Sequence, residues 1–341
     1  MKKNRAENLR IKRKYLVWLA EAKGQAKGSV DKAAAAIDRF SNWLGDRSFK
    51  GFNPDWARGF KRHLEAPGDH GKALSAASVD HTSRALRSFH LWLADQPGYK
   101  SRIRHSDAEY FSPSQRTANS ARGTYWREHP SIEQWRHVLN TMPSDTVIER
   151  RNRAVFAFLG LTGSRDGAAA SLSLGNTDLR AGCVHFRGPG VETKFGKVFT
   201  TWFLPVGGGA REIFDAWVAE LRDVHLFGPH DPLFPKTLVG LGNDRRLGPQ
   251  GLAREPWSSG VRICTIWRSA FESAGLPAYP AHSVRHMLAE LGSRVCRSPE
   301  QLKAFSQNLG HEDVMTTLRS YGTVPAGRQG EIIRSLDVDQ S

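Results

Sequence analysis

The chain has 341 residues and a formal charge of +15, because 49 lysines and arginines face 34 aspartates and glutamates. This length favours two domains of ordinary size, and the generous share of aromatic residues argues against disorder. No run of roughly 18 apolar residues occurs, so no membrane span is expected. A cationic balance of this size favours a polyanionic partner such as duplex DNA, which carries about one charge per 1.7 Å of its axis.

The N-terminal segment is basic, but it does not resemble a secretory signal. Its apolar stretch over 15–20 is short and is ended by Glu21, with no small-residue cleavage pattern behind it. The three cysteines lie far apart and form no Cys-x-x-Cys motif, which fits a reducing compartment and offers no zinc framework. We therefore expect a cytoplasmic protein.

The first hundred residues predict four short amphipathic helices. Apolar side chains recur at helical spacing over 11–19, 30–44 and 79–93. Another helix is expected after Asn53, a cap residue that is followed by a first-turn proline. We expect these helices to form a small bundle, whose basic faces suit contact with DNA phosphates.

A polar stretch without a clear period follows, and it predicts a linker between domains. The predicted organisation is a helical DNA-binding domain over 1–108, a linker over 109–125 and a second domain over 126–341. The second domain mixes helical and strand patterns. The expected fold class is therefore mainly α with a small β-sheet, or α+β.

The second part begins with helical patterns and continues with strands. Ser131 is expected to cap one helix, and the next helix is expected to end near Gly163. Residues 183–186 and 198–204 have the composition of strands and flank a loop with two lysines. These segments together predict a small sheet next to the helices.

The chain beyond the sheet predicts helices interrupted by one long loop. Apolar spacing predicts a helix over 208–225. Residues 228–260 are rich in Gly, Pro and Arg, and we expect them to form a loop inserted over a functional face rather than part of the core. Helices are expected to resume at Val261.

Four short motifs in this second part carry side chains suited to phosphate chemistry. They are Thr162-Gly163-Ser164-Arg165, the loop that holds Lys194, His282-Ser283-Val284-Arg285-His286, and Leu309-Gly310-His311 with Tyr321 ten residues later. Each alone is weak, since a lone arginine usually forms a salt bridge and a hairpin lysine is usually solvated. Together they supply fixed cations for a phosphodiester under attack, a phenol able to attack and to leave, and a proton donor.

Two of these histidines also permit a competing hypothesis. His282 and His286 stand at i and i+4, which is the spacing of a zinc site on a helix. Ser283 occupies the position where a metalloprotease would need its glutamate, and no third ligand is obvious in the sequence. A metal-dependent hydrolase built on this pair would reveal itself by stoichiometric zinc in the purified protein.

The order of the motifs and their residues resemble those of the catalytic domain of tyrosine recombinases, or phage integrases, over roughly 125–325. The family pattern runs Thr-Gly-x-Arg, a hairpin lysine, His-x-x-Arg-His, Leu-Gly-His and a tyrosine near the C-terminus. This sequence carries all of it, and the segment 310–321 is an especially close match. The N-terminal helices resemble the family's core-binding domain by pattern rather than by motif.

The resemblance implies a role for each matching side chain. Tyr321 would attack DNA to form a 3′-phosphotyrosine bond and release a 5′ hydroxyl. Arg165 and Arg285 would hold the scissile phosphate, and His311 would donate a hydrogen bond to it. His282 would assist proton movement near the nucleophile.

The proton for the departing 5′ oxygen would come from the hairpin. Lys194 is the expected general acid, and Lys197 on the same hairpin is the alternative. No metal and no cofactor are implied, because the phosphotyrosine bond conserves the energy needed for religation.

Two positions depart from the family pattern. Ala168 stands where the family usually has a glutamate that supports the first arginine, and whether Asp166 replaces it stays open. The interval from His311 to Tyr321 is one residue longer than in many members, as in some subgroups of the family.

The resemblance implies a site-specific recombinase that exchanges DNA strands through a Holliday junction in the bacterial or phage nucleoid. Its partners would be double-stranded DNA, further copies in a homo-tetramer on paired sites, and a directionality or DNA-bending accessory factor, with no membrane. The two domains would close on DNA as a clamp, and the tail after Tyr321 would dock on a neighbouring subunit. Two further hypotheses remain, a regulator or accessory protein with this fold but no catalysis, and a type IB topoisomerase, which needs no paired sites.

Overall fold

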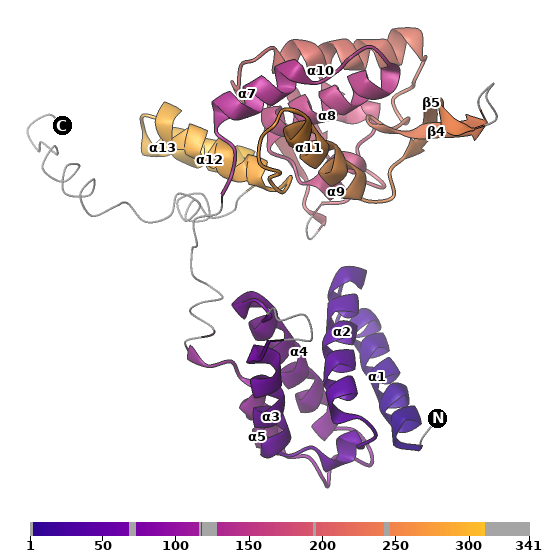
Figure 1. The fold of residues 1–341 in the computed structure, drawn as a ribbon, viewed down its shortest axis with the longest axis vertical. Coiled ribbons are helices and arrows are strands. Elements are labelled where there is room, and N and C mark those ends of the chain that lie inside the picture. The colour runs from indigo at the N-terminus through magenta and orange to yellow at the C-terminus, as the bar shows by residue number, and fades with distance from the viewer. Residues whose placement is uncertain are drawn as a thin grey trace, which may run out of the picture. The chain divides into compact units, whose positions relative to one another are not determined.

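The computed structural model describes residues 3–67, 73–115, 117, 128–193, 196–241 and 246–310. Within these ranges the chain is mostly helical with small antiparallel sheets, so the predicted fold class is confirmed. The chain divides into two compact units, 1–123 and 124–341, and each has its own buried core (Figure 1). None of the helices in the described ranges combines the length and the apolar character needed to cross a bilayer.

The first unit is a bundle whose main helices are those that the apolar spacing predicts. They are α1 (Lys3–Glu21), α2 (Lys27–Leu44), α3 (Pro54–Glu65) and α4 (Ala76–Ala94). Helix α2 contacts both α1 and α4, and a 3-10 turn (Phe49–Gly51) precedes α3. The side chain of Asn53 accepts hydrogen bonds from the backbone N–H groups of Asp55 and Trp56, which caps α3 as expected.

The first unit continues into residues that the sequence places in the linker. After α5 (His105–Ala108), residues 109–111 form a 3-10 turn whose Phe111 is fully buried in the first core. Lys61 of α3 also donates a hydrogen bond of 2.6 Å to the carbonyl of Ser112. Buried apolar surface thus joins 109–111 to the first unit, while most of the remaining linker lies outside the described residues.

A neutral histidine lies in the middle of the first core. His90 is completely buried, and its ring lies 4.0 Å from that of Phe52 and 4.8 Å from that of Phe111, measured between centroids. Its Nδ1 bonds with the carbonyl of Leu86 at 2.8 Å, and its Nε2 has no hydrogen-bond partner among the described residues. Burial lowers the pKa of His90 to about 3, against which the hydrogen bond with Leu86 acts in the opposite direction.

The second unit is built around α8 (Val147–Thr162), which is buried at every residue from 154 to 162. Phe156 stacks between Trp135 and Trp267, with centroid distances of 5.8 and 4.7 Å. Gly160 permits this contact, because a Cβ atom there would lie 2.1 Å from the Trp135 ring. The helices around α8 are α7 (Ile132–Thr141), α9 (Asp166–Ala170), α10 (Ala210–Ala219), α11 (Val261–Ser273), α12 (Ser283–Val295) and α13 (Pro299–Asn308).

Several boundaries in this unit agree with the sequence. Ser131 caps α7 in a capping box with Gln134, α8 ends before Gly163, and α11 begins at Val261 as predicted. The predicted helix over 208–225 is α10 followed by a π-helical turn (Glu220–Val224).

A three-stranded antiparallel sheet covers one part of the second core, in the order β1 (Thr177–Asp178), β2 (Cys183–Phe186), β3 (Phe199–Trp202). A 3-10 turn (Leu174–Asn176) leads into it. The β2–β3 register pairs Cys183 with Trp202 and Phe186 with Phe199, which confirms both predicted strands. The loop between these strands is the one expected to hold the catalytic lysine.

The prediction of one long loop over 228–260 is wrong. This segment contains a second antiparallel pair, β4 (Pro235–Leu241) and β5 (Leu247–Pro256), which projects from the body of the unit (Figure 1). Glycines and prolines that suggest a loop instead accompany a ladder with two register shifts. Most side chains of these strands are exposed or half-buried. The sequence therefore lacks the alternation of apolar and polar residues that would predict them.

The burial of His90 predicts that the first unit loses stability in mild acid. Its pKa in the folded state lies far below the value of about 6.5 that it has in an unfolded chain, so between those values the unfolded state binds the additional proton. Stability should therefore fall as pH decreases below about 6.5, by up to about 1.4 kcal/mol for each pH unit. Urea unfolding at several pH values, followed by tryptophan fluorescence, measures this slope.

The variant His90→Leu removes the titrating group and keeps an apolar side chain of similar size. Its stability should depend less on pH over the same range than that of the unaltered protein, whatever its stability at neutral pH. An equal slope in both proteins would contradict the assignment of acid sensitivity to His90.

Candidate active site

The first site arginine is presented by a tight turn at the end of α8. Gly163 adopts the left-handed conformation (φ 59°) and its N–H donates to the carbonyl of Leu159 at 2.8 Å, which ends the helix. The Thr162 hydroxyl donates to the Ser164 hydroxyl at 3.0 Å and stiffens the turn. Arg165 follows in extended conformation as the cap residue of α9, where it is half-buried.

The second site arginine connects two of the sequence motifs. Arg285 lies in the first turn of α12 and is only 5% exposed. One of its terminal nitrogens donates to the carbonyl of Gly163 at 2.5 Å, and the other donates to the carbonyl of Leu309 at 2.6 Å. One guanidinium group therefore joins the turn that carries Arg165 to the residues that directly precede His311.

The two arginines concentrate positive charge in one recess. Burial, and then the nearby charge of Arg165, lower the pKa of Arg285 to about 9, so Arg285 is still cationic at neutral pH. The Arg165 guanidinium has no hydrogen-bond or ion-pair partner among the described residues. The same recess is lined by the hydroxyl-bearing residues Thr162, Ser164, Thr193 and Thr201. An anion that binds there would relieve the repulsion between the two cations.

Helix α13 is held in place by an amide that the motifs alone do not single out. Asn308 accepts a hydrogen bond from the backbone N–H of Trp202 at 2.7 Å and donates to its carbonyl at 2.8 Å. The Thr201 hydroxyl donates to the carbonyl of Asn308 at 3.1 Å. The only signal in the sequence is the position of Asn308 directly before Leu309-Gly310-His311.

His282 occupies a different place from the two arginines. It is the exposed residue that precedes α12, and it does not line the recess. Its ring lies 5.9 Å from that of His286, which in turn lies 6.1 Å from that of His129. Within the described ranges, no three His, Cys, Asp or Glu side chains lie where they could share a metal ion.

Three predicted site residues, Lys194, His311 and Tyr321, lie outside the described residues. The neighbours of Lys194 are described: Gly196 donates its N–H to the carbonyl of Thr193 at 3.1 Å, and the Thr193 hydroxyl donates to the carbonyl of Lys197 at 2.7 Å. Since Thr193 lines the recess, this part of the hairpin belongs to the site. The choice between the two lysines as general acid stays a prediction.

The position where the family usually has a glutamate is occupied by a small buried residue. Ala168 is 7% exposed and lines the recess. The carboxylate of Asp166 instead accepts a hydrogen bond from the Cys264 thiol on α11 at 3.3 Å. Burial, and then this hydrogen bond, raise the pKa of Cys264 to about 11. Asp166 therefore fastens the start of α9 to α11.

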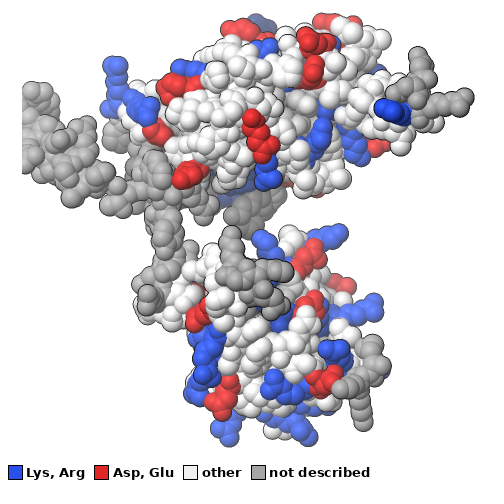
Figure 2. Space-filling model, viewed as in Figure 1, with Lys and Arg blue, Asp and Glu red and all other residues white. Residues whose placement is uncertain are grey.

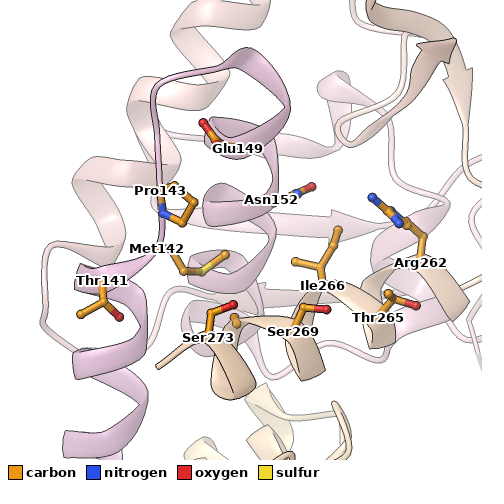
Figure 3. Close-up of a pocket in the computed structure, with 11 residues that line it drawn as sticks. Thr141, Met142, Pro143, Glu149, Asn152, Arg262, Thr265, Ile266, Ser269 and Ser273 are labelled. Carbon is orange, nitrogen blue, oxygen red and sulfur yellow. The ribbon is translucent and has the colours of Figure 1, made fainter. Parts of the chain in front are cut away.

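A separate pocket lies between the end of α7, the start of α8 and α11 (Figure 3). Met142 and Ile266 give it an apolar side, and Asn152, Arg262 and Ser269 contribute polar groups. It contains none of the predicted catalytic residues.

Comparisons with known proteins agree on one kind of relative, although no protein-family model matches the chain. A protein named tyrosine recombinase XerC from Azotobacter vinelandii is 27% identical over 248 residues, which are 73% of this chain and 70% of that protein. The XerC of Stutzerimonas stutzeri is 32% identical over 174 residues, which are 51% of this chain and 48% of that protein. The chain thus spans about half the length of most of the curated relatives it matches.

Solved structures show a similar fold. A lambda integrase dimer bound to a COC′ core site matches with a TM-score of 0.61 at 15% identity, over 92% of this chain and 78% of that chain. The XerH site-specific recombinase bound to its difH substrate matches with a TM-score of 0.56 at 15% identity, over 90% of this chain and 79% of that chain. At such identities the likeness concerns the fold.

The turn at Gly163 yields a prediction about stability. A Cβ atom there would lie 2.5 Å from Leu309 and 3.0 Å from Leu288, and the positive φ adds backbone strain. In Gly163→Ala, Leu309 must move, and its carbonyl is one of the two that Arg285 holds. Gly209→Ala is the matched control, because Gly209 has φ 70° but nothing within 4 Å of the added Cβ.

Gly163→Ala should lower the free energy of unfolding by about 1–3 kcal/mol more than Gly209→Ala does, since overpacking adds to the strain that both variants share. Urea unfolding of the two variants gives the difference. Equal losses in both variants would show that Leu309 and Arg285 do not constrain the turn.

Proposed function

We propose that the chain is a tyrosine recombinase, a site-specific DNA recombinase that cleaves and rejoins strands through a covalent tyrosine intermediate, and its likeness to proteins named tyrosine recombinase XerC supports this. The observation that carries this proposal is that Arg165 and Arg285 line one recess. Arg285 also holds the carbonyl of Leu309, and the segment with His311 and Tyr321 follows directly in the sequence. Half-buried Arg165 and buried Arg285 line the same recess, and two fixed guanidinium groups suit the oxygens of a phosphodiester, whose negative charge grows as it is attacked.

In this proposal the phenol of Tyr321 attacks the scissile phosphorus. The bond from phosphorus to the 5′ oxygen breaks, and a 3′-phosphotyrosine forms. Arg165 binds non-bridging oxygens with its guanidinium fork. Arg285 supplies charge while its two terminal nitrogens hold the backbone. His311 donates a further hydrogen bond to the phosphate in this scheme.

Proton transfers complete the scheme. Lys194, or Lys197 on the same hairpin, protonates the departing 5′ oxygen, and exposed His282 assists proton movement near the nucleophile. A 5′ hydroxyl from the partner strand then attacks the phosphotyrosine and releases Tyr321. Each phosphoester bond that breaks is replaced by another phosphoester bond, so the cycle needs neither metal nor cofactor.

Double-stranded DNA is the proposed substrate, held by both units. Lys and Arg side chains are spread over the visible face of the first unit (Figure 2), which suits contact with a phosphate backbone. Strand exchange through a Holliday junction requires four active sites on paired DNA sites, so a homo-tetramer is the proposed working form, assisted by a directionality or DNA-bending factor. With DNA as its substrate, the protein is proposed to act at the nucleoid in the cytoplasm.

Trapping the covalent intermediate tests the proposal. DNA from around the protein's own gene would carry nicks that let the released 5′ fragment diffuse away, and adducts would be separated on a denaturing gel. The unaltered protein should form an adduct, and Tyr321→Phe should form none. Arg165→Ala should form it about 10²–10³ times more slowly, because one preorganised donor to the developing charge is missing.

Arg180→Ala, an exposed arginine in the turn before β2, is the matched control and should leave the rate unchanged. A complete absence of adduct on DNA that the protein binds would instead favour a regulator or accessory protein on the same fold. An adduct that persists in Tyr321→Phe would refute the assignment of the nucleophile.

A further inference from the structure

The hairpin of β4 and β5 forms no part of the site around Arg165, yet its base is firmly attached to the second unit. Arg151 of α8 is completely buried and donates to the carbonyl of Pro235 at 2.9 Å and to the hydroxyl of Thr237 at 3.0 Å. Its guanidinium also lies 5.0 Å from the ring centre of Trp257, just after β5. A buried cation thus fixes β4 at its base by hydrogen bonds and contacts the residue that follows β5, so the hairpin is held as an arm.

The base of this arm has more positive than negative charge. The partners of Arg151 are a carbonyl, an amide, a hydroxyl and an aromatic ring, and none of its described partners is a carboxylate. Burial, and then the charge of Arg262, lower the pKa of Arg151 to about 10, which places these two cations near each other. Lys236 of β4 is paired with Glu255 at 3.0 Å.

An open cleft lies next to Arg151, between the hairpin and the first residues of α11. Lys236 and Arg262 line it together with the hydroxyl groups of Thr237, Ser258, Ser259 and Thr265. Arg262 also borders the pocket of Figure 3, where Glu149 is engaged in the capping box of α8. Lysine, arginine and hydroxyl side chains are the groups with which proteins contact the DNA backbone.

We propose that this cleft binds a backbone phosphate of the DNA duplex, separate from the phosphate held by Arg165 and Arg285, and that the hairpin is a second DNA-contact arm. This rests on the proposed function only in taking the same DNA as ligand. A two-stranded ribbon fits the major groove, which is about 12 Å wide. Exposed Arg246, directly before β5, adds a cation at the far end of the arm.

The arm also exposes apolar side chains, which would suit a protein partner instead. Leu238, Val239, Leu241 and Leu247 are between 49% and 76% exposed. The charge at the base favours DNA, because a second copy of a chain with net charge +15 would be repelled there. A protein partner is therefore an outcome that the test must separate from DNA.

Salt dependence of DNA affinity distinguishes these outcomes, because each phosphate contact contributes about 0.9 to the slope of log Kd against log salt. The double variant Lys236→Gln/Arg262→Gln would be compared with Arg180→Gln/Arg222→Gln, which removes the same charge from exposed positions elsewhere in the second unit. The probe is a fluorescent duplex of about 40 base pairs of mixed sequence, for which binding is largely a matter of phosphate contacts.

We expect the slope to fall by about 1 in the cleft variant, because one phosphate contact is lost, with about a tenfold loss of affinity at moderate salt, and to stay nearly unchanged in the control. Equal effects in both double variants would overturn the proposal. So would an unchanged slope in the cleft variant combined with altered self-association in Leu241→Ser/Leu247→Ser, measured by sedimentation without DNA.

The covalent trapping experiment on the unaltered protein keeps the two proposals apart. If the protein forms no adduct but the cleft variant shows the selective loss of slope, the DNA-contact arm is supported and the proposed recombinase chemistry is contradicted. If the protein forms the adduct but the cleft variant shows no loss of slope, the chemistry is supported and the DNA-contact arm is contradicted.

Discussion

The candidate active site depends on one buried guanidinium group. Arg285 donates to the carbonyl of Gly163 and to that of Leu309, which belong to segments 122 and 24 residues away in the chain. Hydrogen bonds from a charged donor contribute more than neutral ones, and a buried donor left without an acceptor is costly. The turn that presents Arg165 and the end of α13 are therefore fixed relative to each other by the residue that also supplies charge to the site.

This arrangement has an electrostatic consequence. A second cation beside a buried one is unfavourable without an anion, and Arg165 has no ion-pair partner among the described residues. The structure tolerates this repulsion because a buried apolar core also holds α8, α12 and α13, and the Asn308 amide also attaches α13 to β3. A phosphodiester that enters the recess meets preorganised charge and causes little rearrangement, which is how electrostatic catalysis gains its advantage.

The sequence predicts most of this fold but not the hydrogen bonds that join distant segments of the chain. Helical spacing of apolar residues yields α1 to α4, and Thr162-Gly163 correctly marks the end of α8, because local physics decides these features. The contacts of Arg285, Asn308 and Asp166 join residues far apart in the chain to backbone atoms or to a thiol, and backbone acceptors leave no signature in a sequence. The β4–β5 hairpin was not predicted because its strands bury few side chains and so lack the alternation that reveals a strand.

Hydrogen–deuterium exchange in Arg285→Lys measures the central claim most directly. A lysine ammonium cannot span two carbonyls as the planar guanidinium does. Amide protons around Gly163 and around Leu309 should therefore lose protection together, while those of the first unit keep it. The exposed Arg294 on the same helix provides the control, and Arg294→Lys should change neither segment. Unchanged protection in Arg285→Lys, or loss at only one of the two segments, would show that this guanidinium does not hold the site together.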